Sequence, residues 1–199
     1  MRNVFFTSDH HFYHAGVIKH QPNRHQYMTS DEYKEYISLD DAGKDNFHVS
    51  TKAIENMNND MIAKWNARVS DKDTVYHLGD FTFRNLGLIL PRLKGKIEFV
   101  KGNHDKALME SDYRNMLPDI REVKVFDKTF VLCHYAMRIW HKRHYGTLHL
   151  YGHSHGNLPD DPSSLSFDVG VDCHNMTPLS FDEVMAIMAK KQNVKIDHH

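Results

Sequence analysis

Five short apolar runs in this chain each end abruptly at polar side chains of the kinds that bind metal ions. Short runs rich in β-branched and aromatic residues, bounded by glycine and polar residues, are typical of β-strands. The runs, each with the polar residues after it, are 4–6 before Asp9 and His11, 75–78 before Asp80, 97–100 before Asn103, 130–133 before His134, and 148–151 before His153 and His155. Because ligand sites in open α/β sheets gather beyond the strand ends, we expect these side chains to share one site.

Helical spacing is present between and after the runs. An apolar stripe from Ile54 to Trp65 follows an N-cap at Ser50 or Thr51, which predicts a long helix. Ser180 begins a capping-box pattern ahead of a second apolar stripe, which predicts another helix. Both stripes are interpreted as core-facing surfaces of their helices.

The whole sequence, residues 1–199, predicts a single domain that mixes strands and helices. A third helix is expected over residues 86–93, ending near Gly95, and a late strand over residues 168–172. Residues 21–49 are polar and weakly periodic, so they predict a long loop. Loops of that length are either functional or poorly ordered, and we expect a polar insertion that is a lid over the site or a mobile surface segment.

The charge and cysteine content limit the function classes. Lys and Arg number 25 against 26 Asp and Glu, which gives no strong sign of duplex nucleic-acid binding, because that depends on neutralising phosphates. Cys133 and Cys173 are too few for a disulfide framework or a thiolate zinc cluster and are typical of a reducing cytosol. No apolar run is long enough to cross a membrane. The sequence therefore predicts a soluble, cytoplasmic protein with no membrane partner.

The polar residues at the strand ends form a donor set that suits two neighbouring divalent cations. Carboxylate, imidazole and amide oxygen donors favour manganese, iron, zinc or nickel, and the lack of thiolates argues against a soft-metal cluster. Asp80 directly follows Gly79 at a strand end, where its two oxygens could bridge both ions. The predicted metal ligands are Asp9, His11, Asp80, Asn103, His134, His153 and His155.

The order of these motifs resembles that of the calcineurin-like metallophosphoesterase superfamily, whose signature is D-x-H, G-D, G-N-H-D, a lone His and G-H-x-H. The matching segments are Asp9 with His11, Gly79-Asp80, Gly102 to Asp105, His134, and Gly152 to His155. One block alone is a weak match, whereas five blocks in the right order between residues 9 and 155 are specific. The chain looks most like the small stand-alone members of bacteria and phages.

The resemblance implies a fold and two metal sites. The implied fold is α/β, a two-sheet β-sandwich flanked by helices in the order α-β-β-α. The implied ligands are Asp9, His11, Asp80 and His155 for the first ion, and Asp80, Asn103, His134 and His153 for the second. We expect two divalent metal ions, with manganese first and iron, zinc or nickel as the alternatives.

The resemblance also implies hydrolysis of a phosphate ester by a hydroxide that bridges the two ions. His104 follows the ligand Asn103 but is not a ligand in the family, and it is the expected general acid for the leaving oxygen. Asp105 either orients His104 or caps the helix that follows, and we favour the structural role.

The substrate is less constrained than the metal site. The second block lacks the additional Asp and the Arg-Gly of protein Ser/Thr phosphatases, because Phe81 to Arg84 stand there. We therefore expect a small phosphodiester or nucleotide-like partner, contacted by Arg138 and, second, by His14, with Trp140 stacking on a base. The alternatives are a solvated charge run over residues 138–144, a nuclease, and a non-catalytic scaffold that keeps the fold. Because every motif position is filled, we favour the enzyme.

Overall fold

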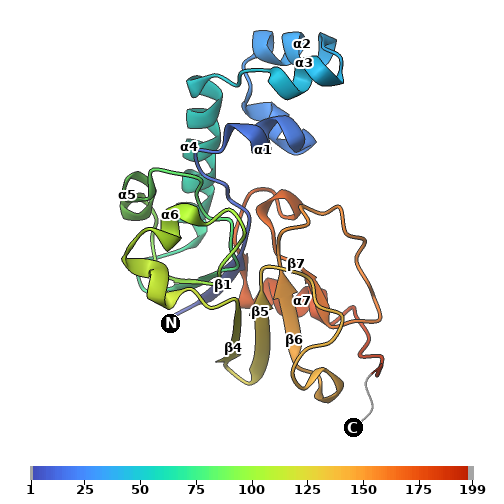
Figure 1. Cartoon of the computed structure of the whole chain (residues 1–199). Coiled ribbons are helices and arrows are strands. Elements are labelled where there is room, and N and C mark those ends of the chain that lie inside the picture. Colours follow the sequence, from blue (N-terminus) through green and yellow to red (C-terminus); the bar gives the residue numbers. More distant parts are fainter. Residues whose placement is uncertain (1, 197–199) are drawn as a thin grey trace.

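Two four-stranded mixed sheets form the centre of the chain, of which this computed structural model describes residues 2–196 (Figure 1). In each sheet three strands run parallel and the strand at one edge is antiparallel. The first sheet has the order β3 (Lys96–Phe99), β2 (Thr74–His77), β1 (Val4–Thr7) and β8 (Leu179–Ser180). The second has the order β4 (Ile120–Val125), β5 (Lys128–Cys133), β6 (Leu148–Tyr151) and β7 (Ser166–Asp168). The expected two-sheet architecture flanked by helices is confirmed.

The two sheets share one apolar core. Phe6 of β1 and Phe130 of β5 have ring centroids 4.9 Å apart, and both side chains are fully buried. Val184 and Met188 of α7 (Phe181–Met188) belong to the same cluster, so this helix covers part of the core. Burying each large apolar side chain stabilises the fold by about 1.5–3 kcal/mol.

The long helix α4 (Thr51–Arg68) lies on the first sheet. Ser50 is its N-cap and accepts the backbone N–H of Ala53, as the sequence predicted. The stripe from Ile54 to Trp65 is buried in a second apolar cluster together with Val75 of β2. The capping box at Ser180, which begins α7, is confirmed as well.

Two sequence predictions need correction. The helix expected over residues 86–93 is divided into α5 (Leu86–Ile89) and a 3-10 turn, η2 (Leu90–Arg92), because Pro91 has no N–H to continue the helix. The strand expected over residues 168–172 ends at Asp168, whose side chain accepts the backbone N–H of Gly170 and turns the chain. Residues Val171–Cys173 form a 3-10 turn, η5.

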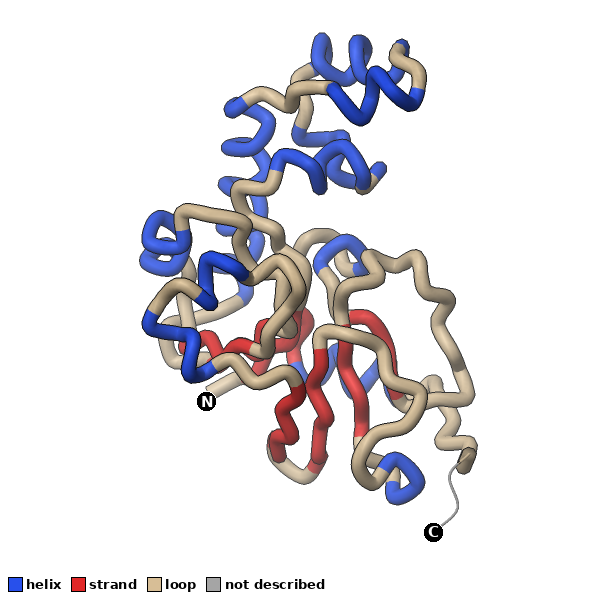
Figure 2. Tube along the Cα trace, viewed as in Figure 1, coloured by secondary structure: helices blue, strands red, loops and turns tan. Residues whose placement is uncertain are grey.

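Residues 21–49 are mostly helical, where the sequence predicted a loop. The elements are η1 (Pro22–Tyr27), α2 (Ser30–Ser38) and α3 (Asp41–Asn46), preceded by α1 (Ala15–His20). Figure 2 shows these helices extending past the sheets beside α4. Thr29 and Glu32 form a capping box at the start of α2, which fixes where that helix begins.

The remaining elements are short. They are α6 (Lys106–Met109) and the 3-10 turns η3 (Asp112–Met116) and η4 (Arg143–Tyr145). Within the described residues, no helix combines the length and the hydrophobicity that crossing a bilayer requires.

Candidate metal centre

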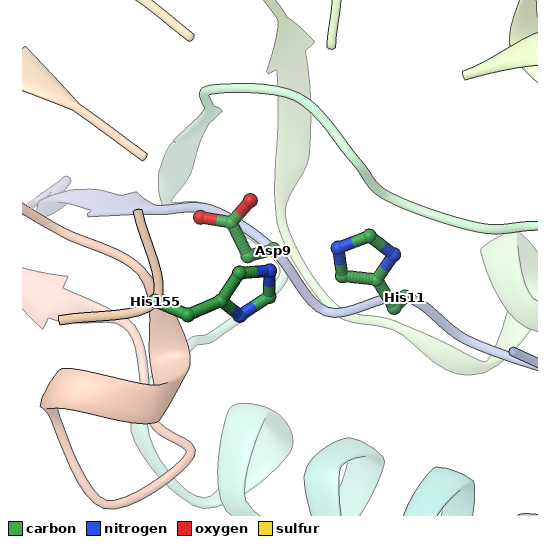
Figure 3. A group of neighbouring side chains, drawn as sticks. All are labelled: Asp9, His11 and His155. Atoms are coloured by element: carbon green, nitrogen blue, oxygen red, sulfur yellow. The ribbon is translucent and has the colours of Figure 1, made fainter. Parts of the chain in front are cut away.

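The loops that follow five strands bring all seven predicted ligands together. Two groups form in which the potential ligand atoms lie within 4.8 Å of one another. The first group is Asp9, His11 and His155, and the second is Asp80, His134 and His153. Figure 3 shows the first group, in which His155 approaches from a different part of the chain than Asp9 and His11.

Asp80 lies between the two groups. Its Oδ2 atom is 3.4 Å from Nε2 of His11 and 3.5 Å from Nε2 of His134. Asn103 belongs with the second group, because its Oδ1 atom is 3.0 Å from Nε2 of His134 and 3.0 Å from Nδ1 of His153. One carboxylate therefore faces both groups, and one amide oxygen completes the second.

The backbone is left-handed at most of these positions. The φ angles are 60° at Asp9, 49° at His11, 55° at Asp80, 68° at His153 and 48° at His155. Such conformations cost about 1–3 kcal/mol each in residues other than glycine, and they persist where the surroundings enforce them. In a regular strand, neighbouring side chains point to opposite faces, so leaving the strand conformation lets these side chains turn towards one site.

The motif glycines allow the loops to approach one another closely. A Cβ atom on Gly102 would lie 2.3 Å from the backbone nitrogen of Asp80. A Cβ atom on Gly152 would lie 2.0 Å from Oγ of Ser8 and 2.5 Å from Oδ2 of Asp9. Only glycine fits at these two positions, which explains its presence before Asn103 and before His153.

Asp105 connects two of the loops. Its carboxylate is 1% exposed and accepts the backbone N–H groups of Asp80 (2.9 Å), Phe81 (2.8 Å) and Gly102 (2.8 Å). Burial raises the pKa of Asp105, although these hydrogen bonds act to lower it. The side chain does not cap α6, so the predicted helix-capping role is wrong, and the carboxylate holds the two loops together instead.

The residues present fit divalent cations. Nε2 of His11 is buried and has no hydrogen-bond partner among the described residues, as expected of an atom that would bind a metal ion. Burial raises the pKa of Asp9 to about 7, so its carboxylate needs a nearby positive charge to stay ionised at neutral pH. The donors are nitrogen and oxygen atoms, the set that manganese, iron, zinc and nickel accept.

His104 and His14 lie beside the first group. The His104 ring is exposed, and its centroid is 5.4 Å from that of His11 and 5.7 Å from that of His14. His14 stacks on Phe83 with a centroid distance of 4.5 Å, and burial lowers its pKa to about 4. Both rings therefore border the first group.

The basic stretch after His134 is placed differently from what the sequence predicted. Arg138 is exposed and lines a cavity of about 490 Å³ together with Tyr151 and Leu158, and none of the seven predicted ligands lines it. Trp140 is 5% exposed and donates its Nε1–H to the carbonyl oxygen of Thr147, so it cannot stack on a base. Tyr135, which the sequence analysis missed, is 48% exposed with its ring 4.7 Å from that of His153.

Two further buried residues contact the first group. Nδ1 of His155 lies 2.6 Å from Oδ2 of Asp172, and Arg24 forms a two-point ion pair with the same carboxylate. Burial acts to raise the pKa of Asp172, but the hydrogen bonds from Arg24 and His155 hold it well below its usual range. Neither residue belongs to one of the five motif segments, and the sequence analysis assigned neither of them to the site.

The site and the fold agree with the comparisons with known proteins. The model of the calcineurin-like phosphoesterase superfamily domain matches residues 47–165, more than half of the chain, and the chain belongs to this superfamily. Membership indicates a phosphoesterase, that is, a hydrolase of phosphate esters, and the two groups of His and Asp could hold its metal ions.

Two individual proteins are similar over nearly their whole length. An uncharacterized protein of Methanocaldococcus jannaschii, MJ1445, is 28% identical over 205 residues, which cover 98% of this chain and 96% of that protein. The crystal structure of AQ665 from Aquifex aeolicus, a protein of unknown function, superposes with a TM-score of 0.60 at 19% identity. That superposition covers 94% of this chain and 100% of the other and shows a shared fold.

Proposed function

We propose that this protein hydrolyses a small phosphodiester or nucleotide-like substrate with two divalent metal ions. The first ion would be held by Asp9, His11, Asp80 and His155, and the second by Asp80, Asn103, His134 and His153. The observation that carries this proposal is the position of Asp80, whose Oδ2 atom lies about equally far from His11 and His134. A carboxylate between two such groups is the arrangement that a two-ion site requires.

When bound, two such ions supply Lewis-acid activation of water and offset charge on the phosphoryl oxygens. The chain itself orients the donors. The backbone N–H of His104 donates to Oδ1 of Asp80 at 2.8 Å, which leaves Oδ2 of Asp80 facing the two histidines. Asp105 holds the Asp80 loop against the Gly102 loop, so both loops keep their spacing as a substrate binds.

His104 is the proposed proton donor to the leaving oxygen. Its ring is exposed beside the first group and is not part of either group of ligands, so a ring N–H is free to face the substrate. An alkoxide leaving group needs a proton as the ester bond breaks, and a positioned histidine supplies it at neutral pH.

Tyr135 supports a nucleotide-like substrate. Its exposed ring lies beside His153, and its hydroxyl lies 3.4 Å from Oδ1 of Asn103. An aromatic face at the edge of a site can stack on a base, a contact worth about 1–3 kcal/mol. His14 is a second proposed substrate contact, whereas Arg138, in its separate cavity, would reach only a distant part of a substrate.

The test is hydrolysis of bis-p-nitrophenyl phosphate and p-nitrophenyl phosphate by protein stripped with a chelator, before and after adding Mn²⁺, Ni²⁺, Zn²⁺ or Mg²⁺. We expect the diester to be cleaved faster than the monoester, and only after an ion is restored. Isothermal titration with Mn²⁺ alone should give two ions per chain. Two bound ions without turnover of either ester would overturn the proposed activity and favour a binding protein.

A further inference from the structure

The carboxylate of Asp172 determines which nitrogen of His155 is free. Asp172 lies in η5, and its Oδ2 atom is 2.6 Å from Nδ1 of His155. The side chain of Asp172 is 1% exposed, so this contact is shielded from water. A histidine that donates one ring N–H to a carboxylate has its orientation and its tautomer fixed, and the other nitrogen remains as a ligand atom. Nε2 of His155 is therefore the atom left for the group with Asp9 and His11.

Arg24 in turn fixes Asp172. Its side chain is fully buried, its Nε donates to Oδ1 of Asp172 at 2.7 Å, and its Nη2 donates to Oδ2 at 2.6 Å. Two parallel hydrogen bonds between a guanidinium and a carboxylate set the plane as well as the position of the carboxylate. Asp172 is thus held on one side by Arg24 and contacts His155 on the other.

The same guanidinium also holds the backbone that carries Asp9. Nη2 of Arg24 donates to the carbonyl oxygen of Asp9 at 2.6 Å, and Nη1 donates to that of His10 at 2.9 Å. This is the segment in which Asp9 and His11 have left-handed φ angles. Arg24 therefore contacts Asp172, which holds His155, and it also contacts the backbone carbonyl groups of Asp9 and of the residue before His11.

The burial of this ion pair calls for a reason other than stability. Removing two charges from water costs much of the free energy that their attraction contributes, and apolar side chains of the same volume often stabilise a fold as well or better.

Arg24 reaches the site from η1, in the helical region that the sequence predicted to be a loop. Tyr27 anchors η1 to α4 through a hydrogen bond of 2.6 Å from its hydroxyl to Asp60.

We infer that Arg24 and Asp172 are positioning residues for the first metal ion, through the hydrogen bonds that orient His155 and the Asp9–His10 backbone. The inference rests on the proposed two-ion function. It assigns a task to the helical region over residues 22–46, which supplies one of the two residues. It also predicts that damage to this pair affects one ion and spares the other, because within residues 2–196 neither side chain forms a hydrogen bond or ion pair with His134, His153 or Asn103.

The experiment is isothermal titration of Mn²⁺ into chelator-stripped native protein, Arg24→Lys and Asp172→Asn. Lysine keeps the charge but cannot make the two-point contact, and asparagine keeps the shape of Asp172 without its charge. We expect two ions per native chain, and in each variant a loss of about 10- to 100-fold in affinity for one ion. In each variant, the electron paramagnetic resonance signal of two coupled Mn²⁺ ions should be absent at Mn²⁺ concentrations that fill both sites of the native protein. Asp172→Asn is the smaller change and serves if Arg24→Lys fails to fold.

Tyr27→Phe is the matched control, because it loosens the attachment of η1 without touching Arg24. It should bind two ions with native affinities, and an equal loss in this variant would overturn the specific role of Arg24. Native affinities in both Arg24→Lys and Asp172→Asn would overturn the inference alone, even if the metal-free variants unfold more easily. Native protein that binds no Mn²⁺ would overturn the proposed function and this inference together.

Discussion

The Oδ2 atom of Asp80 lies 3.4 Å from Nε2 of His11, although the two residues follow different strands of the first sheet. That contact joins the two groups of predicted ligands into one site. It exists because the loop after β2 and the loop after β1 are held together by backbone hydrogen bonds, including one from the N–H of His11 to the carbonyl of Asp80. The consequences of this arrangement can be measured.

Asp80→Asn should abolish most of the activity. The substitution keeps the size of the side chain but removes the charge that faces both groups. We expect the rate of diester cleavage at saturating Mn²⁺ to fall by more than about 100-fold, since changes to residues that merely support ligands already cost about 10- to 100-fold. Asp31→Asn, in a fully solvated position on α2, is the control. A variant that keeps a tenth of the native rate would contradict a bridging role.

His104→Ala should slow the reaction according to the leaving group. A general acid contributes about 10²- to 10⁴-fold, and its loss matters most when the leaving oxygen is a poor leaving group. We expect the loss in kcat/KM to be small for p-nitrophenyl esters and large for esters of aliphatic alcohols. Lys106→Ala, an exposed residue two positions further on, should show no such trend. Equal losses for every leaving group would exclude proton donation by His104.

Asp105→Ala should destabilise the fold. The change leaves three backbone N–H groups without their acceptor in a region closed to water. An unsatisfied buried donor costs about 1–3 kcal/mol, so the free energy of unfolding should fall by at least about 3 kcal/mol. Urea unfolding in the presence of a chelator measures this without a contribution from bound metal. A change below about 1 kcal/mol would mean that water replaces the carboxylate.

Gly152→Ala should displace Asp9 and weaken Mn²⁺ binding. The new methyl group would lie 2.5 Å from Oδ2 of Asp9, closer than van der Waals contact allows. The chain offers a matched control in Gly87, a residue of α5 where an added Cβ meets nothing within 4 Å. Gly87→Ala should leave metal binding unchanged and stabilise the protein by about 0.4–1 kcal/mol. The prediction fails if Gly152→Ala binds Mn²⁺ like the native protein.

His149 should make the fold less stable at acidic pH. Its ring is fully buried, with Nδ1 2.8 Å from the carbonyl oxygen of Val131 and Nε2 accepting the N–H of Met137. Burial lowers its pKa to about 4. As the pH falls, the unfolded chain takes up a proton near pH 6.5 and the folded chain does not until about pH 4. Stability is therefore lost within that window.

The size of this effect follows from a comparison with His149→Gln. The variant should be less stable at pH 8, and its deficit in the free energy of unfolding should shrink by about 3 kcal/mol on going to pH 4. Urea unfolding of both proteins in a chelator at several pH values gives the two curves. A deficit that stays constant with pH would show that His149 does not titrate in this range.

The seven candidate ligands could be predicted to lie together because each stands shortly after a strand signal, and side chains beyond the ends of neighbouring strands meet at one edge of a sheet. The long helix α4 could also be predicted, because the N-cap Ser50 and the apolar stripe that ends at Trp65 are local features of the sequence. The helical region over residues 22–46 was missed although Thr29 and Glu32 form a capping box, because its few apolar residues give little periodicity. Its order comes largely from tertiary contacts such as that of Tyr27 with Asp60.

Arg24 and Asp172 could not be found in this way. Arg24 is a single charged residue in a polar stretch, Asp172 ends a short run that was predicted to be a strand, and only the burial of their side chains against each other distinguishes them. The hydrogen bonds of Trp140 and Asp105 could not be predicted either, because their partners are backbone groups that come close only in the folded chain. Local patterns predict elements and motifs, whereas contacts between distant segments require the structure.

The positions of the first group's residues along the chain determine when, during synthesis, this group can assemble. Arg24 and Asp172 are 148 positions apart, and the amide of His153 that donates to Asp9 is 144 positions from it. Synthesis proceeds from the N-terminus, so Asp9 and His11 leave the ribosome long before their partners. A growing chain has no complete pocket for an ion at this group until residue 172 has emerged. On the proposed two-ion function, metal would therefore enter this group only after the segment from His153 to Asp172 has left the ribosome.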